Sequence, residues 1–117
     1  MKRFFFPDRA AVALTGVLYA LSDPTRLRIA ALLDETGDQC CSQGELAAVP
    51  KSTLAHHFKV LRENGIITTR TEGTYSVNSL RRADLDARFP GLLDAVLNAA
   101  HTRSILHSEF EKEKAPA

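Results

Sequence analysis

The sequence predicts a single, mainly α-helical domain, spanning residues 1–117, that contains one small β-hairpin. Three observations predict this fold. Apolar residues recur at helical spacing in several segments, two β-prone runs flank a glycine-containing turn, and glycine and proline separate the segments. The length of 117 residues fits one domain, and 44% hydrophobic with 25% charged residues is ordinary for a globular protein.

The N-terminal half predicts two helices and a shorter third one. Residues 8–21 should form the first helix, because apolar side chains gather on one face there: Val12, Val17, Leu18 and Leu21. Asp23 followed by Pro24 is a preferred helix start, with an N-cap before proline, and this second helix should run to about residue 34. Residues 43–48 have room only for a short helix before the next proline.

The most informative segment is residues 51–64. Apolar side chains repeat there at i, i+4 and i+7, namely Leu54, Phe58 and Leu61. Gly65 follows, at the position where glycine commonly ends a helix. Residues 66–69 and 75–77 are β-prone and are separated by a turn over residues 71–74, so this helix should lead directly into the hairpin.

Two more helices are expected after the hairpin. Ser79 is a candidate cap for a brief helix that carries Leu80, Leu85 and Phe89, and a longer apolar-faced helix should span residues 91–113. Three helices followed by a two-stranded hairpin are the winged helix-turn-helix arrangement. The helix before the hairpin then enters the DNA major groove, and the hairpin is the wing.

Charge is distributed unevenly along the chain. The formal net charge of +1 alone does not indicate a nucleic-acid partner. Residues 1–50 have five basic and six acidic groups (net −1), residues 51–82 have six and two (net +4), and residues 83–117 have four and six (net −2). The positive excess therefore lies on the helix and hairpin that should meet DNA, where attraction to phosphates acts locally.

The outer face of the 51–64 helix is the candidate DNA-reading surface: Lys51, Ser52, Thr53, Ala55, His56, Lys59 and Arg62. Such side chains bind phosphates or base edges. His57 is closer to the apolar stripe, so it either joins this surface or packs beneath the helix. Arg70 and Thr74 of the wing are candidates for the DNA backbone or the minor groove. A plain solvated helix face is the alternative interpretation.

Two motifs make the sequence resemble the ArsR/SmtB family of bacterial repressors. Residues 20–29, ALSDPTRLRI, resemble the family's L-x-DPTRL-x-I signature, and residues 52–67, STLAHHFKVLRENGII, resemble its recognition helix, STVSHHLKVLREAGLI. The resemblance covers about residues 10–80. It implies a homodimeric winged-helix repressor on a near-palindromic operator, which dimerises through its first and last helices and often releases DNA on sensing a metal, metalloid or oxidant.

Cys40 and Cys41 are the candidate sensor thiols. Family members that bind arsenite or soft metals often have C-x-C on the short third helix, whereas this pair is vicinal. We expect it in the loop before residues 43–48 or at the N-terminus of that helix, where the helix dipole favours a thiolate. Arsenite prefers three thiolates, so a third would come from another subunit or a small thiol. Oxidation, soft-metal binding and no sensing role all stay open.

Other sites and classes have weaker support. Asp94 and His107 are separated like two ligands of the family's zinc site, but apolar residues occupy the other ligand positions, so no metal is predicted there. For Phe4-Phe5-Phe6, packing on the dimer or a terminal helix is favoured over a ligand pocket.

The sequence thus predicts a cytoplasmic DNA-binding repressor and not an enzyme. It has no C-x-x-C motif and no acid–base constellation, and no apolar run reaches the roughly 18 residues of a membrane span. The alternative is a winged-helix repressor or protein-interaction module without an inducer site of its own. A protein-binding face, however, should present apolar anchors where this helix is polar.

Overall fold

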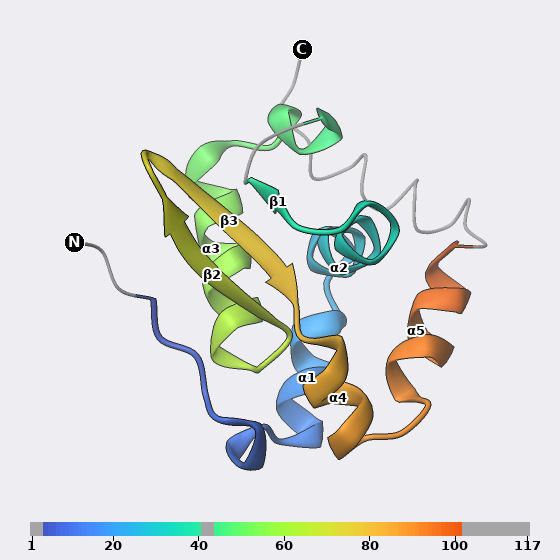
Figure 1. Ribbon diagram of the computed structural model, residues 1–117. Helices are drawn as coiled ribbons and strands as arrows, with labels where there is room; N and C mark the ends of the chain where they lie inside the picture. The colour runs from blue at the N-terminus through green and yellow to red at the C-terminus, as the bar shows by residue number, and fades with distance from the viewer. Residues whose placement is uncertain (1–3, 41–43, 102–117) are drawn as a thin grey trace.

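The computed structural model describes residues 4–40 and 44–101, and it shows a mainly helical fold with a small antiparallel sheet (Figure 1). The elements in chain order are η1 (Arg9–Ala11), α1 (Leu14–Leu21), α2 (Pro24–Thr36), β1 (Gln39–Cys40), η2 (Gly44–Ala48), α3 (Lys51–Glu63), β2 (Ile67–Glu72), β3 (Tyr75–Leu80), α4 (Arg82–Arg88) and α5 (Leu92–His101). Helices α2 and α3 followed by the β2–β3 hairpin confirm the predicted mainly helical fold with its hairpin.

Helix α2 begins as the sequence predicts. The carboxylate of Asp23 accepts hydrogen bonds from the backbone N–H groups of Thr25 at 2.9 Å and Arg26 at 3.1 Å, and Pro24 occupies the first turn. The helix runs two residues beyond the predicted end and stops before Gly37, whose φ of 82° suits a residue without Cβ.

The hairpin is paired as expected, but the sheet has a third strand. Strands β2 and β3 are antiparallel, and the pairing of Glu72 with Tyr75 leaves a two-residue loop at the tip of the hairpin. Strand β1 adds to β3 by pairing Gln39 with Asn78 and Cys40 with Val77, giving the order β1-β3-β2. A strand of two residues is too short to carry a period-2 pattern, which is why the sequence did not reveal it.

The first helix is shorter than predicted. Residues 9–11 form only a 3₁₀ turn, Val12 and Ala13 are extended with ψ of 124° and 140°, and the α-helix starts at Leu14. Tertiary contacts determine this interruption. The side chain of Val12 is buried, and its carbonyl accepts a hydrogen bond from Arg88 at 2.6 Å.

The segment after the hairpin also differs in one detail. Ser79 lies within β3 and does not cap a helix, and α4 begins after Arg81. Leu85 is buried, as its position in the pattern indicated. For the helix predicted over residues 91–113, α5 confirms the first part, and residues 102–113 lie outside the described residues.

The core lies between α1, α2, α3, α5 and the start of the hairpin. Its fully buried side chains include Val17, Ile29, Leu61, Ile66, Ile67 and Leu97. Figure 1 shows α3 and the hairpin together on one side of the molecule, and α5 on the other. None of the helices in the described part of the chain has the length and apolarity that crossing a membrane requires.

Candidate nucleic-acid interface

Helix α3 is held at its C-terminal end by very close packing. Gly65 follows the helix with φ of 83°, and a Cβ on it would lie 2.5 Å from a methyl carbon of Val12. Gly16 of α1 makes a similar approach, since a Cβ there would lie 2.5 Å from Oδ1 of Asn64. These two contacts fix the end of α3 against α1 and the residues before it, so the orientation of its outer face is set by the core.

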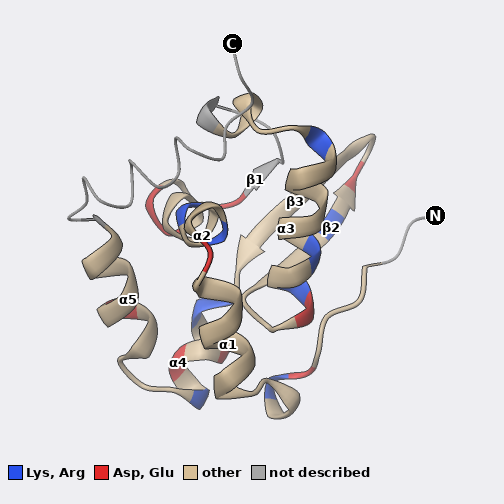
Figure 2. Ribbon diagram, turned by 180° about the vertical axis from the view of Figure 1, so that it is seen from behind, with Lys and Arg blue, Asp and Glu red and all other residues tan. Residues whose placement is uncertain are grey.

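The outer face of α3 presents most of the predicted reading residues to solvent. Lys51, Ser52, Ala55, His56 and Lys59 are exposed, while Thr53 and Arg62 are half-buried. Figure 2 shows the basic positions spaced along the length of the helix. The apolar face, with Leu54, Phe58 and Leu61, is buried as predicted.

Ion pairing separates the six basic residues of segment 51–82 into two groups. Arg70, Arg81 and Arg82 are all paired with carboxylates. Within the described part of the chain, Lys51, Lys59 and Arg62 form no ion pair, and all three belong to α3. Within segment 51–82, the basic residues without a carboxylate partner therefore all lie on α3, a narrower location than the sequence indicated.

The guanidinium of the wing residue Arg70 already has ion-pair partners within the protein. Its guanidinium donates to Glu72 at 2.7 Å, to Ser79 at 2.9 Å and to Asp38 at 3.1 Å. The hydrogen bonds to the two carboxylates raise the pKa of Arg70, the one to Glu72 more than the one to Asp38. Because its charge is balanced locally, its predicted contact with DNA has less support than that of α3.

The tip of the wing offers a residue that sequence reasoning missed. Thr74 is exposed at the tip, as a candidate DNA contact should be, and the adjacent Tyr75 is an exposed large aromatic side chain at 64%. In the sequence Tyr75 indicated only β propensity. An aromatic residue two positions after the turn glycine was the signal that would have drawn attention to it.

His57 is the one predicted reading residue that the structure places in the interior. It is only 4% exposed, and its Nδ1 lies 3.2 Å from Nη1 of Arg26 and 3.8 Å from the carboxylate of Asp23. Buried Arg26 also donates to the carbonyls of Ala20 at 2.8 Å and Tyr19 at 3.4 Å. His57 thus joins α3 to the start of α2 and packs beneath the helix, so the first of its two predicted placements, among the DNA-reading residues, is wrong.

The two thiols are only partly described. The backbone of Cys40 belongs to strand β1, opposite Val77 of the wing, and Cys41 lies outside the described residues. The expected position of the pair, in a loop or at a helix N-terminus, is therefore wrong for Cys40. The helix-dipole argument for its thiolate does not apply in a strand.

Only one of the two weak metal candidates lies in the described part of the chain. Asp94 accepts a hydrogen bond from Arg82 at 2.8 Å, and His107 lies outside the described residues. No group of three or more histidine, cysteine, aspartate or glutamate residues suited to a metal ion occurs among the residues that the structure describes.

Fold and site together define a winged helix-turn-helix DNA-binding domain, and the comparisons with known proteins agree. A family profile described as "Helix-turn-helix domain" matches residues 21–70. The arsenical resistance operon repressor of Staphylococcus aureus is 34% identical over 93 residues, which cover 79% of this chain and 86% of that protein. An uncharacterized HTH-type transcriptional regulator of Bacillus subtilis is 35% identical over 82 residues, 68% of this chain and 82% of that protein.

A crystal structure of an ArsR family transcriptional regulator has a TM-score of 0.56 and 23% identity, and covers 87% of this chain and 100% of that one, which shows a likeness of fold. The chain belongs to the ArsR family of helix-turn-helix transcriptional regulators. It is accordingly a DNA-binding regulator and not an enzyme.

Proposed function

We propose that this protein is a homodimeric transcriptional repressor that binds a two-fold-symmetric operator through α3. The observation that carries the proposal is the row of uncompensated cations on that helix, Lys51, Lys59 and Arg62. Relatives in two Staphylococcus species are named arsenical resistance operon repressors, which supports repression as the mode of regulation.

The start of α3 is suited to a phosphate. Pro50 occupies the N-cap position and no side-chain hydrogen bond caps the helix, so the N–H groups of the first turn point outward without a side-chain partner. A helix N-terminus of this kind attracts anions. With that end at the DNA backbone, His56 faces the groove from the next turn, and Lys59 is assigned to a phosphate.

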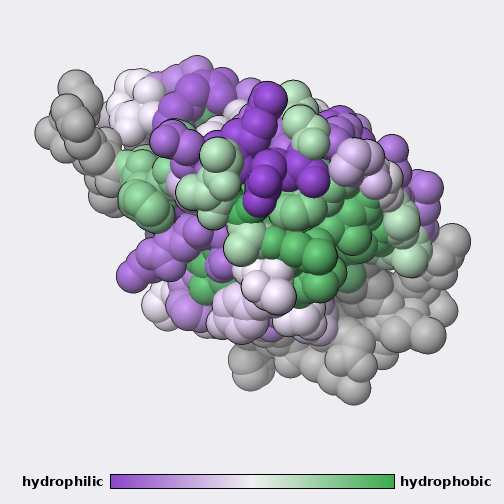
Figure 3. Space-filling view, turned by 90° about the horizontal axis from the view of Figure 1, so that it is seen from below, coloured by the Kyte–Doolittle hydropathy of each residue, from purple (hydrophilic) through white to green (hydrophobic). Residues whose placement is uncertain are grey.

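Support for a dimer comes from the underside of the molecule. Helix α1 exposes Leu14, Leu18 and Tyr19, of which Leu18 is 46% and Tyr19 57% accessible. Beside them, a shallow cleft between α1, α4 and α5 is lined only by apolar side chains: Val17, Leu21, Leu85, Leu92 and Leu93. Figure 3 shows apolar surface on this side. An apolar patch of this kind suits burial against a second copy.

The test of α3 is a comparison of two charge-removing variants. Lys59→Ala should weaken binding to operator and to random duplex DNA about equally, because a phosphate contact carries no sequence information. The slope of log K against log salt should fall by about 0.9 for each lost phosphate contact. Arg70→Ala, with the same change in net charge, is the matched control and should lose much less, since Arg70 is already paired with Asp38 and Glu72.

An unchanged salt slope for Lys59→Ala, or a loss with Arg70→Ala as large as that with Lys59→Ala, would contradict DNA binding centred on α3. The wing would then be at least an equal partner in the interface.

We further propose that modification of Cys40 and Cys41, by an oxidant or by arsenite, releases the DNA. Support comes from β1, because the backbone of Cys40 pairs with the wing strand β3, and from its place in the chain just before η2 and α3. A changed thiol there acts on the segment that positions both DNA-contacting elements. The alternative is a regulator with no inducer site of its own.

Operator binding by wild type and by the double variant Cys40→Ser/Cys41→Ser, with and without oxidant or arsenite, separates these two proposals. Thiol sensing predicts that wild type releases the operator, that a reductant restores binding after oxidation, and that the double variant stays bound. If wild type keeps the operator in the presence of both reagents, thiol sensing fails and the alternative stands.

A further inference from the structure

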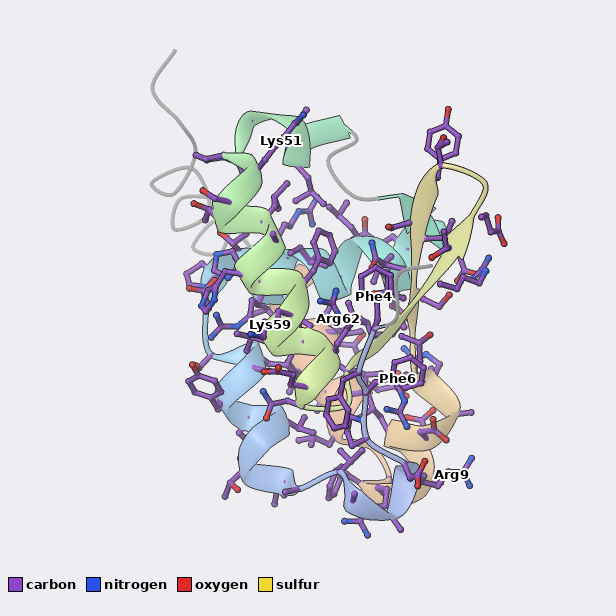
Figure 4. All side chains as sticks on the ribbon, turned by 90° about the vertical axis from the view of Figure 1, so that its left-hand side faces the viewer. Phe4, Phe6, Arg9, Lys51, Lys59 and Arg62 are labelled. Atoms are coloured by element: carbon purple, nitrogen blue, oxygen red, sulfur yellow. The ribbon has the colours of Figure 1, made fainter. Side chains whose placement is uncertain are left out.

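The chain before α1 lies along the seam between α3 and the hairpin. We call residues 4–12 the N-terminal arm. In Figure 4 the arm passes from Arg9 past Phe6 to Phe4, which lies beside Arg62 of α3. The Phe4 ring thus lies beside α3 and the Phe6 ring beside Arg81, whereas the sequence had favoured packing on the dimer or on a terminal helix.

Several contacts hold the arm in this path. Arg9 donates to the carboxylate of Asp84 at 2.7 Å, and Arg81 donates to the carbonyl oxygen of Pro7 at 2.7 Å. At the far end the buried side chain of Val12 packs against Gly65, immediately after α3. The arm is therefore attached to α4 and to the end of α3, and its aromatic end lies at Arg62, in the last turn of α3.

Phe4 covers the guanidinium of Arg62. The guanidinium carbon lies 4.7 Å from the centre of the Phe4 ring, within the range of a cation–π contact. On the hairpin side, Nη1 of Arg62 is 3.5 Å from the hydroxyl of Thr69, which itself donates to Asn78 at 2.7 Å. The side chain is thus held between the arm and β2.

Arg62 differs from the other arginines around it in lacking a carboxylate. Arg70, Arg81 and Arg82 all have one, whereas no acidic side chain in the described part of the chain pairs with Arg62. Burial lowers the pKa of Arg62, and the charge of the neighbouring Glu63 opposes this less strongly. The guanidinium is thus partly withdrawn from water without a carboxylate paired to it in the described part of the chain. A guanidinium has five N–H donors in a rigid fork, and the contact with Thr69 uses one.

We propose that the N-terminal arm is a third part of the DNA-binding surface, in which Phe4 is a positioning residue that holds Arg62 for a phosphate of the DNA backbone. The phosphate supplies the directly paired anion that Arg62 lacks among the described residues, and Arg62 lies one turn beyond Lys59 on the same side of α3. This inference rests on the proposed function of α3, and it adds an element that winged-helix topology alone does not include.

The experiment measures the affinity and salt slope for operator DNA and random DNA in three arm variants. Phe4→Leu keeps apolar bulk but removes the ring face, and should weaken binding to both DNAs by about 2- to 5-fold per protomer, the factor that a cation–π contact corresponds to. Phe4→Tyr keeps a ring face and should bind like wild type. Phe5→Ala is the matched control, because Phe5 is 68% exposed, and it should also bind like wild type.

A double variant shows whether Phe4 acts through Arg62. Arg62→Ala should lower the salt slope by about 0.9 per lost contact, and Phe4→Leu added to it should have no further effect. Wild-type affinity and slope in Phe4→Leu would overturn the proposal, as would equal losses from Phe4→Leu with and without Arg62. If wild type itself shows no salt-dependent DNA binding, the proposed function of α3 fails instead.

Discussion

His56 and His57 are neighbours in the chain but face in different directions from α3. Their ring centres are 5.8 Å apart, His56 is exposed on the outer face, and His57 is buried against Arg26. Arg26 has no acceptor atom, so a hydrogen bond between these two side chains has Nδ1 of His57 as its acceptor. One histidine is placed to read DNA and the other to connect two helices.

Alanine substitutions should separate these two roles. His57→Ala should lower the free energy of unfolding by about 1–3 kcal/mol, because it leaves the buried guanidinium of Arg26 short of an acceptor. His56→Ala should leave stability almost unchanged and reduce the preference for operator over random DNA. Urea unfolding and duplex titrations of both variants measure the two effects.

Equal loss of operator and random binding in His56→Ala would show that His56 does not read bases. Unchanged stability in His57→Ala would show that the contact with Arg26 contributes nothing to folding.

Residue roles were only partly predictable from the sequence. The outer face of α3 follows from local spacing, so Lys51, His56 and Lys59 were placed correctly on the exposed side. Whether a polar residue is engaged depends on partners far along the chain. Arg26 meets His57 across 31 residues, and Arg70 meets Asp38 across 32, which no local pattern reports.

At the scale of elements, local signals predicted α2, α3 and the hairpin, and long-range contacts account for what differed. The N-cap of α2 and the glycine after α3 stand in the sequence itself. The break before Leu14 depends on the fit of Val12 against Gly65 and on the hydrogen bond from Arg88, 76 residues away. Strand β1 forms only because β3 presents an edge to it.

The attachment of the N-terminal arm should depend on pH. Asp84 accepts hydrogen bonds from Arg9 at 2.7 Å and Arg81 at 3.0 Å. Both hold the pKa of that carboxyl below its usual value, and the bond from Arg9 has the larger effect. A depressed carboxyl pKa means that the stabilisation is complete above the pKa of the unfolded chain and is lost as pH falls through the folded value.

Asp84→Asn should therefore cost up to about 1 kcal/mol of unfolding free energy near neutral pH, the range for exposed ion pairs. The difference between variant and wild type should shrink as the pH is lowered from neutral through the depressed pKa of the wild-type carboxyl, which then also loses its charge. Urea unfolding of both proteins across that pH range measures it. A difference that stays constant with pH would mean that the charge of Asp84 is not what secures the arm.

At the scale of the whole molecule, the near-neutral total charge conceals a row of cations on α3 that have no carboxylate partner among the described residues. In segment 51–82, carboxylates balance the charges of Arg70, Arg81 and Arg82, and the other three basic residues lie on α3. The apolar residues of α1 lie on another side of the molecule. Separate polar and apolar faces fit a protein that meets DNA with one surface and a second copy with the other.

The dimer proposal has a simple variant test. Leu18→Glu places a charge in the exposed apolar face of α1 and should shift the protein to a monomer in sedimentation velocity, with a matching loss of operator affinity. Ala47→Glu, at an exposed position of η2, introduces the same charge and should leave the oligomeric state unchanged. A dimer of undiminished stability in Leu18→Glu would place the subunit contact elsewhere.

Sequence-specific DNA binding by α3 is tested most directly by one titration of wild-type protein. Fluorescence anisotropy would compare the duplex upstream of the protein's own gene with a shuffled duplex of the same composition, at about 50 and 200 mM salt. We predict a preference of roughly 10³-fold or more for the upstream duplex, weaker binding at the higher salt, and saturation at two protomers per site. Equal affinity for the two duplexes, or binding that is indifferent to salt, would contradict it.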